Sequence, residues 1–275
     1  MNFTSKIVNI DHLHFHLVTG GTGKPVVLIH GLTNNWEGHI PLATALGKTF
    51  KVYIPDMPGY GDSGRLKRYN IEQMSKSLYA LVQKLGIKPL AVMGLSMGGF
   101  IAADFAKSYT QATESAIIMG PVLRDKHRGV NAAKYFFKST KIVPGGRTIL
   151  KKIVETKSIA YLFAKYVNMY RFNKELIDKY GMNGKKKMTK DAYVEMGIAA
   201  AEYDFDATLR TIRTPTLLVY GREDKMSSFT YAQKFVLPGN PHLDLAVILE
   251  AGHIVSLEKP RETARAITSF LNQLK

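Results

Sequence analysis

Short apolar runs alternate with helical patterns along most of the chain. The run Pro25-Val26-Val27-Leu28-Ile29 has no polar position, which is typical of a strand buried on both faces of a parallel sheet. Comparable runs recur at 51–54, 90–93, 115–119, 215–220 and 245–249. Between them, a helix is predicted from Asn70, a good N-cap, to Gly86, and a last helix from about Pro260. The alternation predicts an α/β fold, with an open, mostly parallel sheet flanked by helices.

The pattern changes between about Pro121 and Tyr203. No strong strand signal occurs there, and amphipathic, aromatic-rich helical stretches are predicted instead at 132–137, 148–170 and 192–201. We interpret this part as an inserted helical cap over the sheet. The predicted division is a first core part at 1–121, the cap at 122–203 and a second core part at 204–275. Within the cap, Lys185-Lys186-Lys187 is interpreted as a solvated loop.

The net charge is concentrated in the predicted cap. The whole chain has 38 Lys and Arg against 22 Asp and Glu, a formal charge of +16. Residues 124–213 alone hold 20 basic and 9 acidic residues. A solvated outer face explains such a block most simply. Weak association with an anionic membrane surface is the next interpretation, and no nucleic-acid partner is expected, because no binding motif is present.

Composition excludes several kinds of chemistry and location. The chain has no cysteine, so disulfides, cysteine nucleophiles and thiolate metal sites are excluded. No apolar run approaches the roughly 18 residues of a membrane-spanning helix, and the first residues lack an apolar signal core. We therefore expect a cytoplasmic protein.

A serine occupies a strand-to-helix turn. Gly94-Leu95-Ser96-Met97-Gly98 has the form G-x-S-x-G and joins the predicted strand at 90–93 to a helix that begins about Met97. Such a turn strains the serine backbone and needs glycines where helix and strand approach each other. The spacing predicts a serine hydroxyl that projects above the sheet as a nucleophile.

A serine nucleophile needs a base and a carboxylate, and both follow later strands. His253 lies in the loop after the last predicted strand, and Asp224 follows the strand at 215–220, with Glu223 as its rival. Ser96, Asp224 and His253 thus appear in the order Ser…Asp…His, each at the carboxyl end of a different strand. The backbone N–H groups of Leu32 and Met97 are the expected oxyanion donors.

These features resemble the α/β-hydrolase superfamily, in its capped branch with a His-Gly motif, over nearly the whole chain outside the insertion. The resemblance rests on His30-Gly31, the loop at 56–63, the serine turn, the segment 221–224, and Gly252-His253 with Glu258 and Pro260 downstream. It implies the hydrolase fold, the catalytic triad and a helical cap. Ser96 disfavours the branches that carry aspartate or cysteine at this position, such as epoxide hydrolases and dienelactone hydrolases.

Other residues receive secondary assignments. Trp36, Phe136 and Phe137 are candidates to line the substrate pocket. His30 and Asp56 are interpreted as structural residues of their loops. A further group, His12, His14 and His16, alternates as on one face of a strand, and we favour the exposed face of an edge hairpin over a metal site. A match to a dinucleotide-binding pattern at 59–64 is interpreted as false, because no helix is predicted to begin there.

The predicted function is hydrolysis of a small-molecule carboxylic ester, as a carboxylesterase or small lipase. No metal or organic cofactor is expected. A carbon–carbon hydrolase, a lactonase or a thioesterase would use the same triad, and a ligand-binding receptor of the same fold is a further alternative.

Overall fold

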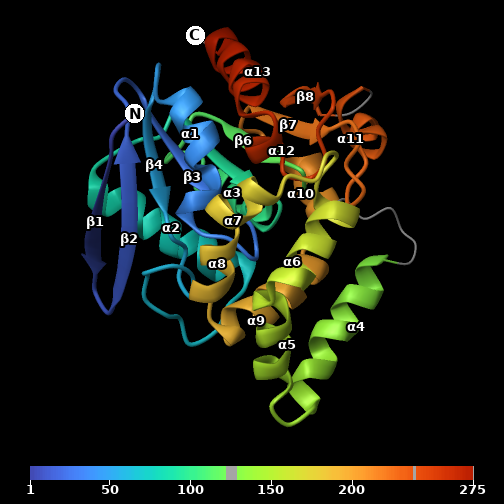
Figure 1. Ribbon diagram of the computed structural model, residues 1–275. Coiled ribbons are helices and arrows are strands. Elements are labelled where there is room, and N and C mark those ends of the chain that lie inside the picture. Colours follow the sequence, from blue (N-terminus) through green and yellow to red (C-terminus); the bar gives the residue numbers. More distant parts are fainter. Residues whose placement is uncertain (122–128, 238–239, 275) are drawn as a thin grey trace.

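The computed structural model describes residues 1–121, 129–237 and 240–274 and contains one eight-stranded sheet (Figure 1). Its strand order is β1-β2-β4-β3-β5-β6-β7-β8. The six strands from β3 to β8 are parallel, and β1 and β2 add an antiparallel hairpin beside β4. The strands are β1 (Phe3–Ile10), β2 (Leu13–Gly20), β3 (Pro25–Ile29), β4 (Lys51–Pro55), β5 (Ala91–Leu95), β6 (Ala116–Met119), β7 (Thr216–Gly221) and β8 (Leu243–Ile248). The predicted mostly parallel sheet is therefore confirmed.

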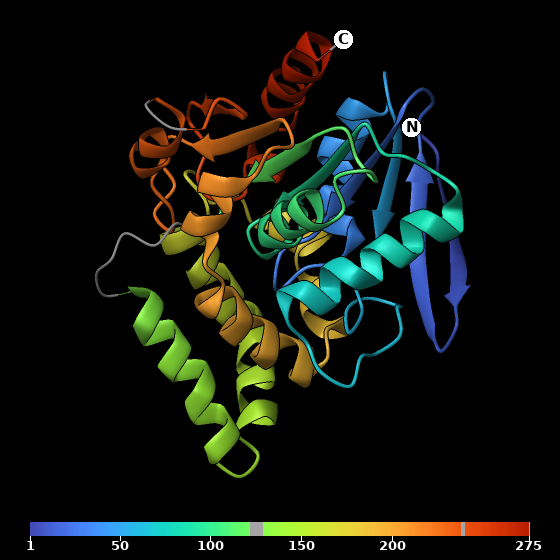
Figure 2. The same cartoon turned by 180° about the vertical axis from the view of Figure 1, so that it is seen from behind.

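Helices cover both faces of the sheet, because the strands bury side chains on both sides. In β3, Val27 and Ile29 join one core cluster and Val26 and Leu28 join the other. The first cluster packs under α2 (Ile71–Leu85) and α3 (Met97–Ser108), and the second under α1 (Ile40–Leu46) and α13 (Pro260–Gln273). Shorter elements complete the core: the 3-10 helix η1 (Trp36–His39), α10 (Phe205–Thr211), α11 (Phe229–Val236) and α12 (Val255–Glu258). Figure 2 shows α2 and α3 from the side hidden in Figure 1.

The ends of α2 lie where the sequence predicts them. The Asn70 side chain accepts a hydrogen bond of 2.7 Å from the N–H of Gln73, which satisfies one of the free donors at the helix start. Gly86 ends the helix with φ of +63°, a left-handed conformation that costs glycine little.

Between β6 and β7 the described chain is helical, and we call residues 129–202 the cap helices. They are α4 (Gly129–Ile142), α5 (Gly146–Glu155), α6 (Lys157–Phe163), the π-helical turn η2 (Ala164–Asn168), α7 (Lys174–Tyr180), α8 (Met182–Lys187) and α9 (Lys190–Glu202). In both views α4 and α5 project from the body, and α9 lies between them and the core (Figures 1 and 2). The segment 122–128, where the predicted cap begins, lies outside the described residues, so the domain limits stay a prediction.

Two details of the helical prediction are wrong. The stretch predicted at 148–170 is broken at Thr156, between α5 and α6. The three lysines at 185–187 belong to helix α8 rather than to a loop. Among the described residues, none of the helices combines the length and the apolar character needed to cross a bilayer.

Candidate active site

Ser96 occupies the turn between β5 and α3 in a strained conformation. Its φ of 53° and ψ of −114° fall where side-chain-bearing residues are rarely found. The flanking glycines permit this turn, because a Cβ on Gly94 would lie 1.9 Å from the Gly98 carbonyl oxygen. A Cβ on Gly98 would lie 2.3 Å from the Ile29 carbonyl oxygen. The helix, the turn and strand β3 therefore approach one another more closely than any other residue would allow.

The loop after β3 lies directly beside this serine. A Cβ on Gly31 would stand 3.9 Å from the Ser96 Cβ and 3.5 Å from the Leu95 carbonyl oxygen. Leu32 follows Gly31, and Met97 follows Ser96 as the first residue of α3. Both predicted oxyanion donors thus lie in segments adjoining the serine, and their role stays a prediction.

Asp224 and His253 form a hydrogen-bonded pair, from the loops after β7 and β8. The distance from His253 Nδ1 to Asp224 Oδ2 is 3.0 Å, and both side chains are almost fully buried. The other carboxylate oxygen accepts the N–H groups of Met226 at 2.8 Å and Ser227 at 3.1 Å. Burial by itself raises the pKa of the Asp224 carboxyl, but the hydrogen bond and charge of His253, with the Ser227 hydroxyl, lower the pKa below its ordinary value. Asp224 is therefore held as a carboxylate that faces the imidazole.

The rival carboxylate, Glu223, has a different partner. Its Oε2 accepts the N–H of Ala251 at 3.1 Å, and its own N–H donates to the Ala251 carbonyl at 3.0 Å. Glu223 thus links the loop after β7 to the loop that carries His253, while Asp224 contacts the ring.

Gly120 is a neighbour of His253 that the sequence did not single out. It directly follows β6 and has φ of +53°. A Cβ there would lie 3.0 Å from the His253 carbonyl oxygen and 3.3 Å from Nδ1. Its position at the end of a buried strand is the one sequence signal that points to it.

The residue before Gly120 contacts the serine turn. The Ser96 N–H donates to the carbonyl of Met119 at 2.8 Å. The turn at Met119-Gly120 therefore links the serine turn to the histidine loop, although the Ser96 hydroxyl and the His253 ring make no direct hydrogen bond within the described residues. Such contacts often tighten only when substrate binds.

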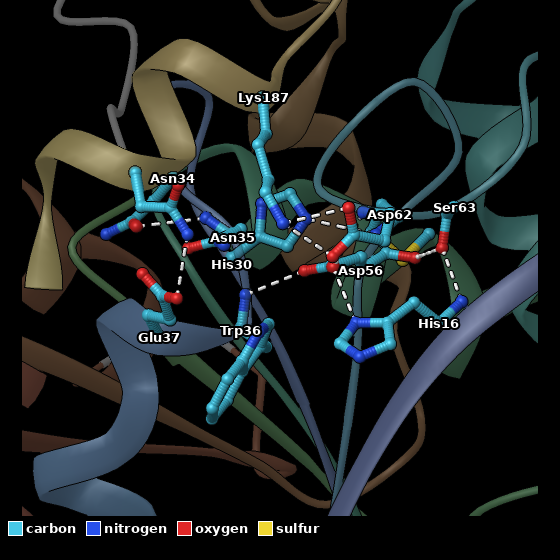
Figure 3. Close-up of polar contacts among 12 residues, drawn as sticks. His16, His30, Asn34, Asn35, Trp36, Glu37, Asp56, Asp62, Ser63 and Lys187 are labelled. Carbon is cyan, nitrogen blue, oxygen red and sulfur yellow. Dashed lines mark hydrogen bonds and ion pairs between the residues drawn. The ribbon is translucent and has the colours of Figure 1, made fainter. Parts of the chain in front are cut away.

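Asp56 holds the loop after β3 in place (Figure 3). Its Oδ1 accepts the N–H of Trp36 at 2.8 Å, and its Oδ2 accepts the N–H of Asp62 at 3.1 Å. Nearby, His30 Nε2 accepts the N–H of Met57 at 3.0 Å, while its Nδ1 lies 2.9 Å from the Gly31 carbonyl oxygen. Burial lowers the pKa of His30, so the ring is neutral, with its proton on Nδ1. The structural roles expected for His30 and Asp56 agree with these contacts.

His16 also belongs to this cluster, which corrects the interpretation for one of the three alternating histidines. The hairpin of β1 and β2 lies at the sheet edge, and His12 and His14 are exposed as expected, but the His16 side chain is only 12% exposed. The His16 Nδ1 lies 2.8 Å from Asp56 Oδ2. The hydrogen bond to Asp56 raises the pKa of His16, against the effect of burial.

His16, Asp56 and Asp62 each offer a ligand atom within 4.8 Å of the others, a spacing that a metal ion could use. These atoms are already engaged, since Lys187 of α8 pairs with Asp62 at 2.6 Å and His16 pairs with Asp56. The cluster is thus a network that joins the cap helices to the loops of the core.

A strap from the cap helices holds the histidine loop. The N–H of His253 donates to the Asn168 carbonyl at 2.7 Å. Glu258 accepts the N–H of Gly252 on Oε1 at 3.0 Å and the N–H of Tyr170 on Oε2 at 2.7 Å. Burial raises the pKa of Glu258, although these backbone hydrogen bonds oppose the shift. We call residues 168–171 the cap strap, and it holds the histidine loop directly at His253 and indirectly, through Glu258, at Gly252.

The surroundings of the three predicted pocket residues are defined in the structure. The Trp36 ring makes edge contacts with Phe3 and His16, beside β1 and β2. Phe136 is 53% exposed on α4, and Phe137 packs its ring on Tyr193 of α9. The pocket assignment finds no support in these contacts.

Lys185 is a cation that the sequence did not single out. It extends from α8 toward the loop after β3, and its Nζ lies 3.4 Å from the Thr33 hydroxyl. Burial lowers its pKa to about 8. The Lys185 ammonium group therefore lies beside Thr33, the residue that follows the predicted oxyanion donor Leu32.

Comparison with known proteins identifies the family of this chain. The family model of the alpha/beta hydrolase fold matches residues 24–260. A 2-hydroxy-6-oxo-6-phenylhexa-2,4-dienoate hydrolase of Burkholderia cepacia is 24% identical, over 98% of this chain and 96% of that protein. Monoacylglycerol lipase abhd6-B of Xenopus laevis is also 24% identical, over 92% of this chain and 78% of that protein. The chain spans 65% of the length of another relative, the dihydrolipoyllysine-residue acetyltransferase component of the acetoin cleaving system of Pseudomonas putida, at 26% identity over 92% of this chain.

Solved structures agree on the fold. A thermophilic esterase from Thermogutta terrifontis superposes with a TM-score of 0.77 at 22% identity, covering 100% of this chain and 99% of that chain. At this identity the likeness concerns the fold alone.

Proposed function

Because this chain belongs to the alpha/beta hydrolase fold family, we propose that it is a serine hydrolase of carboxylic esters, a carboxylesterase or small lipase. The proposal rests on one observation above the others. Ser96 is held in a strained strand-to-helix turn at the sheet edge where the Asp224–His253 pair also lies. Strain of this kind is retained where the surrounding structure enforces it, commonly at a functional site.

The proposed reaction gives each of these residues a role. His253 takes the proton of the Ser96 hydroxyl as the oxygen attacks the ester carbonyl, and Asp224 stabilises the imidazolium through Nδ1. The N–H groups of Leu32 and Met97 hold the oxyanion. The imidazolium then protonates the departing alcohol. A water molecule, deprotonated by the same histidine, releases the acid from the acyl-enzyme and restores Ser96.

Hydrolysis of chromogenic esters of increasing acyl length tests this proposal. We expect Ser96→Ala to lower kcat by at least about a thousandfold and to abolish labelling by a fluorophosphonate. Ser108→Ala, at the exposed end of the same helix, is the matched control. If Ser96→Ala keeps the turnover of the control variant, or if the native protein resists the label and hydrolyses no ester, the proposal fails.

A carbon–carbon hydrolase is the second candidate, and Lys185 favours it. A partly buried ammonium beside the predicted oxyanion loop can bind a carboxylate, which the dienoic acids that such enzymes cleave carry and simple alkyl esters lack. Parallel assays of a 6-oxo-dienoic acid and of alkyl esters separate the two candidates. For an acid substrate, we expect Lys185→Met to raise KM for the acid and to leave KM for neutral esters unchanged. An equal effect of Lys185→Met on both substrates would contradict a role in carboxylate binding.

A further inference from the structure

Exposed apolar side chains concentrate in one part of the cap helices. Of the 17 large hydrophobic residues that are exposed in the described chain, 12 lie between residues 135 and 172. Single exposed hydrophobic residues are ordinary on soluble proteins, but a concentration of them marks an interaction surface. We call the segment from α4 through residue 172 the apolar lobe. Its helices α4 and α5 project away from the sheet (Figure 1).

The arrangement on α6 and η2 is inverted relative to an ordinary surface helix. Small residues, Ala160 and Ala164, face the protein and are only 4% and 2% exposed. The large residues face solvent, at positions i, i+3, i+4 and i+7: Ile159, Leu162, Phe163 and Tyr166, which are 41 to 59% exposed. This spacing is the apolar stripe that an amphipathic helix normally turns toward a core. Here the stripe faces outward.

Neighbouring elements extend the apolar surface. On α5, Ile149 and Ile153 are one helical turn apart and are 55% and 46% exposed. The link between α4 and α5 exposes Ile142 at 83% and Val143 at 53%. Since α5 packs against both α4 and α6, these residues belong to the same lobe.

Basic residues surround the apolar ones. Residues 134–174 contain ten Lys and Arg and a single acidic residue, Glu155. Several of these cations are paired, but Lys141, Lys152 and Lys165 are exposed without a carboxylate partner among the described residues. An apolar stripe bordered by unpaired lysines is the composition that binds at the interface of an anionic bilayer.

We propose that the apolar lobe docks on the surface of an anionic lipid bilayer. Its isoleucine, leucine and aromatic side chains enter the boundary between headgroups and acyl chains, while its lysines contact lipid phosphates and carboxylates. A second copy of this chain is a poor occupant, because two lobes of strong like charge would repel each other. Nucleic acid would satisfy the lysines but would leave the aliphatic stripe in water. The proposal does not depend on the esterase assignment, since docking is measured without turnover.

Vesicle sedimentation of the full chain tests this proposal. We expect binding to vesicles of equal parts phosphatidylserine and phosphatidylcholine, weakened by high salt, and at least about tenfold weaker binding to phosphatidylcholine alone. Leu162→Gln/Phe163→Gln should weaken binding to the anionic vesicles at least about tenfold, because two insertion sites are lost. Lys152→Gln/Lys165→Gln should do the same at low salt and lose its effect at high salt.

The matched control replaces two exposed hydrophobic residues outside the lobe, Ile7→Gln/Leu237→Gln, which are 52% and 79% exposed in the native chain. This variant should bind as the native protein does, and circular dichroism establishes that all variants fold. Absence of vesicle binding overturns the proposal, as does equal binding by the lobe and control variants. Analytical ultracentrifugation and random-sequence duplex DNA test the other occupants. A dimer that only the lobe variant dissociates, or tight DNA binding without vesicle binding, would also overturn it.

Discussion

Replacement of Gly120 by alanine tests whether the position of His253 controls turnover. Gly120 has φ of +53°, and an added Cβ would lie 3.0 Å from the His253 carbonyl oxygen and 3.3 Å from Nδ1. The first consequence is backbone strain, because an L-residue in the left-handed region costs about 1–2 kcal/mol. The second is displacement, because the methyl group and the histidine must separate by a few tenths of an ångström.

These two effects can be separated by a second glycine. Gly86, at the end of α2, has φ of +63°, and an added Cβ there would meet nothing within 4 Å. Gly86→Ala therefore introduces the same kind of strain without pressing on the site. Both variants should lose about 1–2 kcal/mol of unfolding free energy in urea. In addition, Gly120→Ala should lower kcat about tenfold, since misplacement of a catalytic group by 1 Å costs on the order of a hundredfold.

The assay is steady-state ester hydrolysis at a temperature where both variants are folded, paired with urea unfolding of the same preparations. KM should change little for Gly120→Ala, because the added methyl group would contact His253, which we propose as the base. If Gly120→Ala and Gly86→Ala lose equal stability and keep equal kcat, the structural link between Gly120 and the proposed base, His253, is refuted.

Two further predictions concern the charged pairs. Asp224→Asn should lower kcat about 10⁴-fold by favouring the wrong tautomer of His253. Glu223→Gln should mainly lower the free energy of unfolding. Steady-state assays and urea unfolding would show the opposite pattern if Glu223 were the catalytic partner. His16→Gln should destabilise the fold by about 1 kcal/mol, with a defined pH dependence. Because the folded-state pKa of His16 lies above 6.5, the charged pair with Asp56 stabilises fully below about that pH and is lost as pH rises through the raised pKa. Toward acid, the pair is lost as pH falls through the lowered pKa of Asp56. The urea midpoints of the native protein and of His16→Gln should differ most near pH 5.5 and converge at alkaline pH. A difference in midpoint that stays constant with pH would contradict the ion pair.

Most of the core could be predicted from the sequence because its determinants are local. An unbroken apolar run such as that of β3 specifies a buried strand, and Asn70 and Gly86 specify the ends of α2. The positions of Ser96, Asp224 and His253 could also be predicted. Each residue follows a parallel strand, and parallel strands bring their carboxyl ends to one edge of the sheet.

The rest depends on contacts between distant segments. Glu258 binds Tyr170, which is 88 positions away in the sequence, and no local pattern encodes that contact. Helix α8 contains three consecutive lysines, which favoured a loop. Its actual conformation is stabilised by the pairing of Lys187 with Asp62, 125 positions away, and by the close approach of Gly184 to Asn34. The location of β2 within the sheet likewise depends on its pairing with β4, which His16 alone could not reveal.

In the proposed hydrolase, the hydrogen bond between the Asn168 carbonyl and the His253 N–H would restrict how substrate enters. If the whole cap swung away as a rigid lid, the base would lose a backbone partner and Glu258 would lose Tyr170. We therefore expect substrate entry in such an enzyme to move other cap helices while the strap stays in contact with the histidine loop. For engineering, a chimaera that exchanges only the helices N-terminal to the strap should retain the backbone support of His253, whereas one that exchanges the strap as well must rebuild that support.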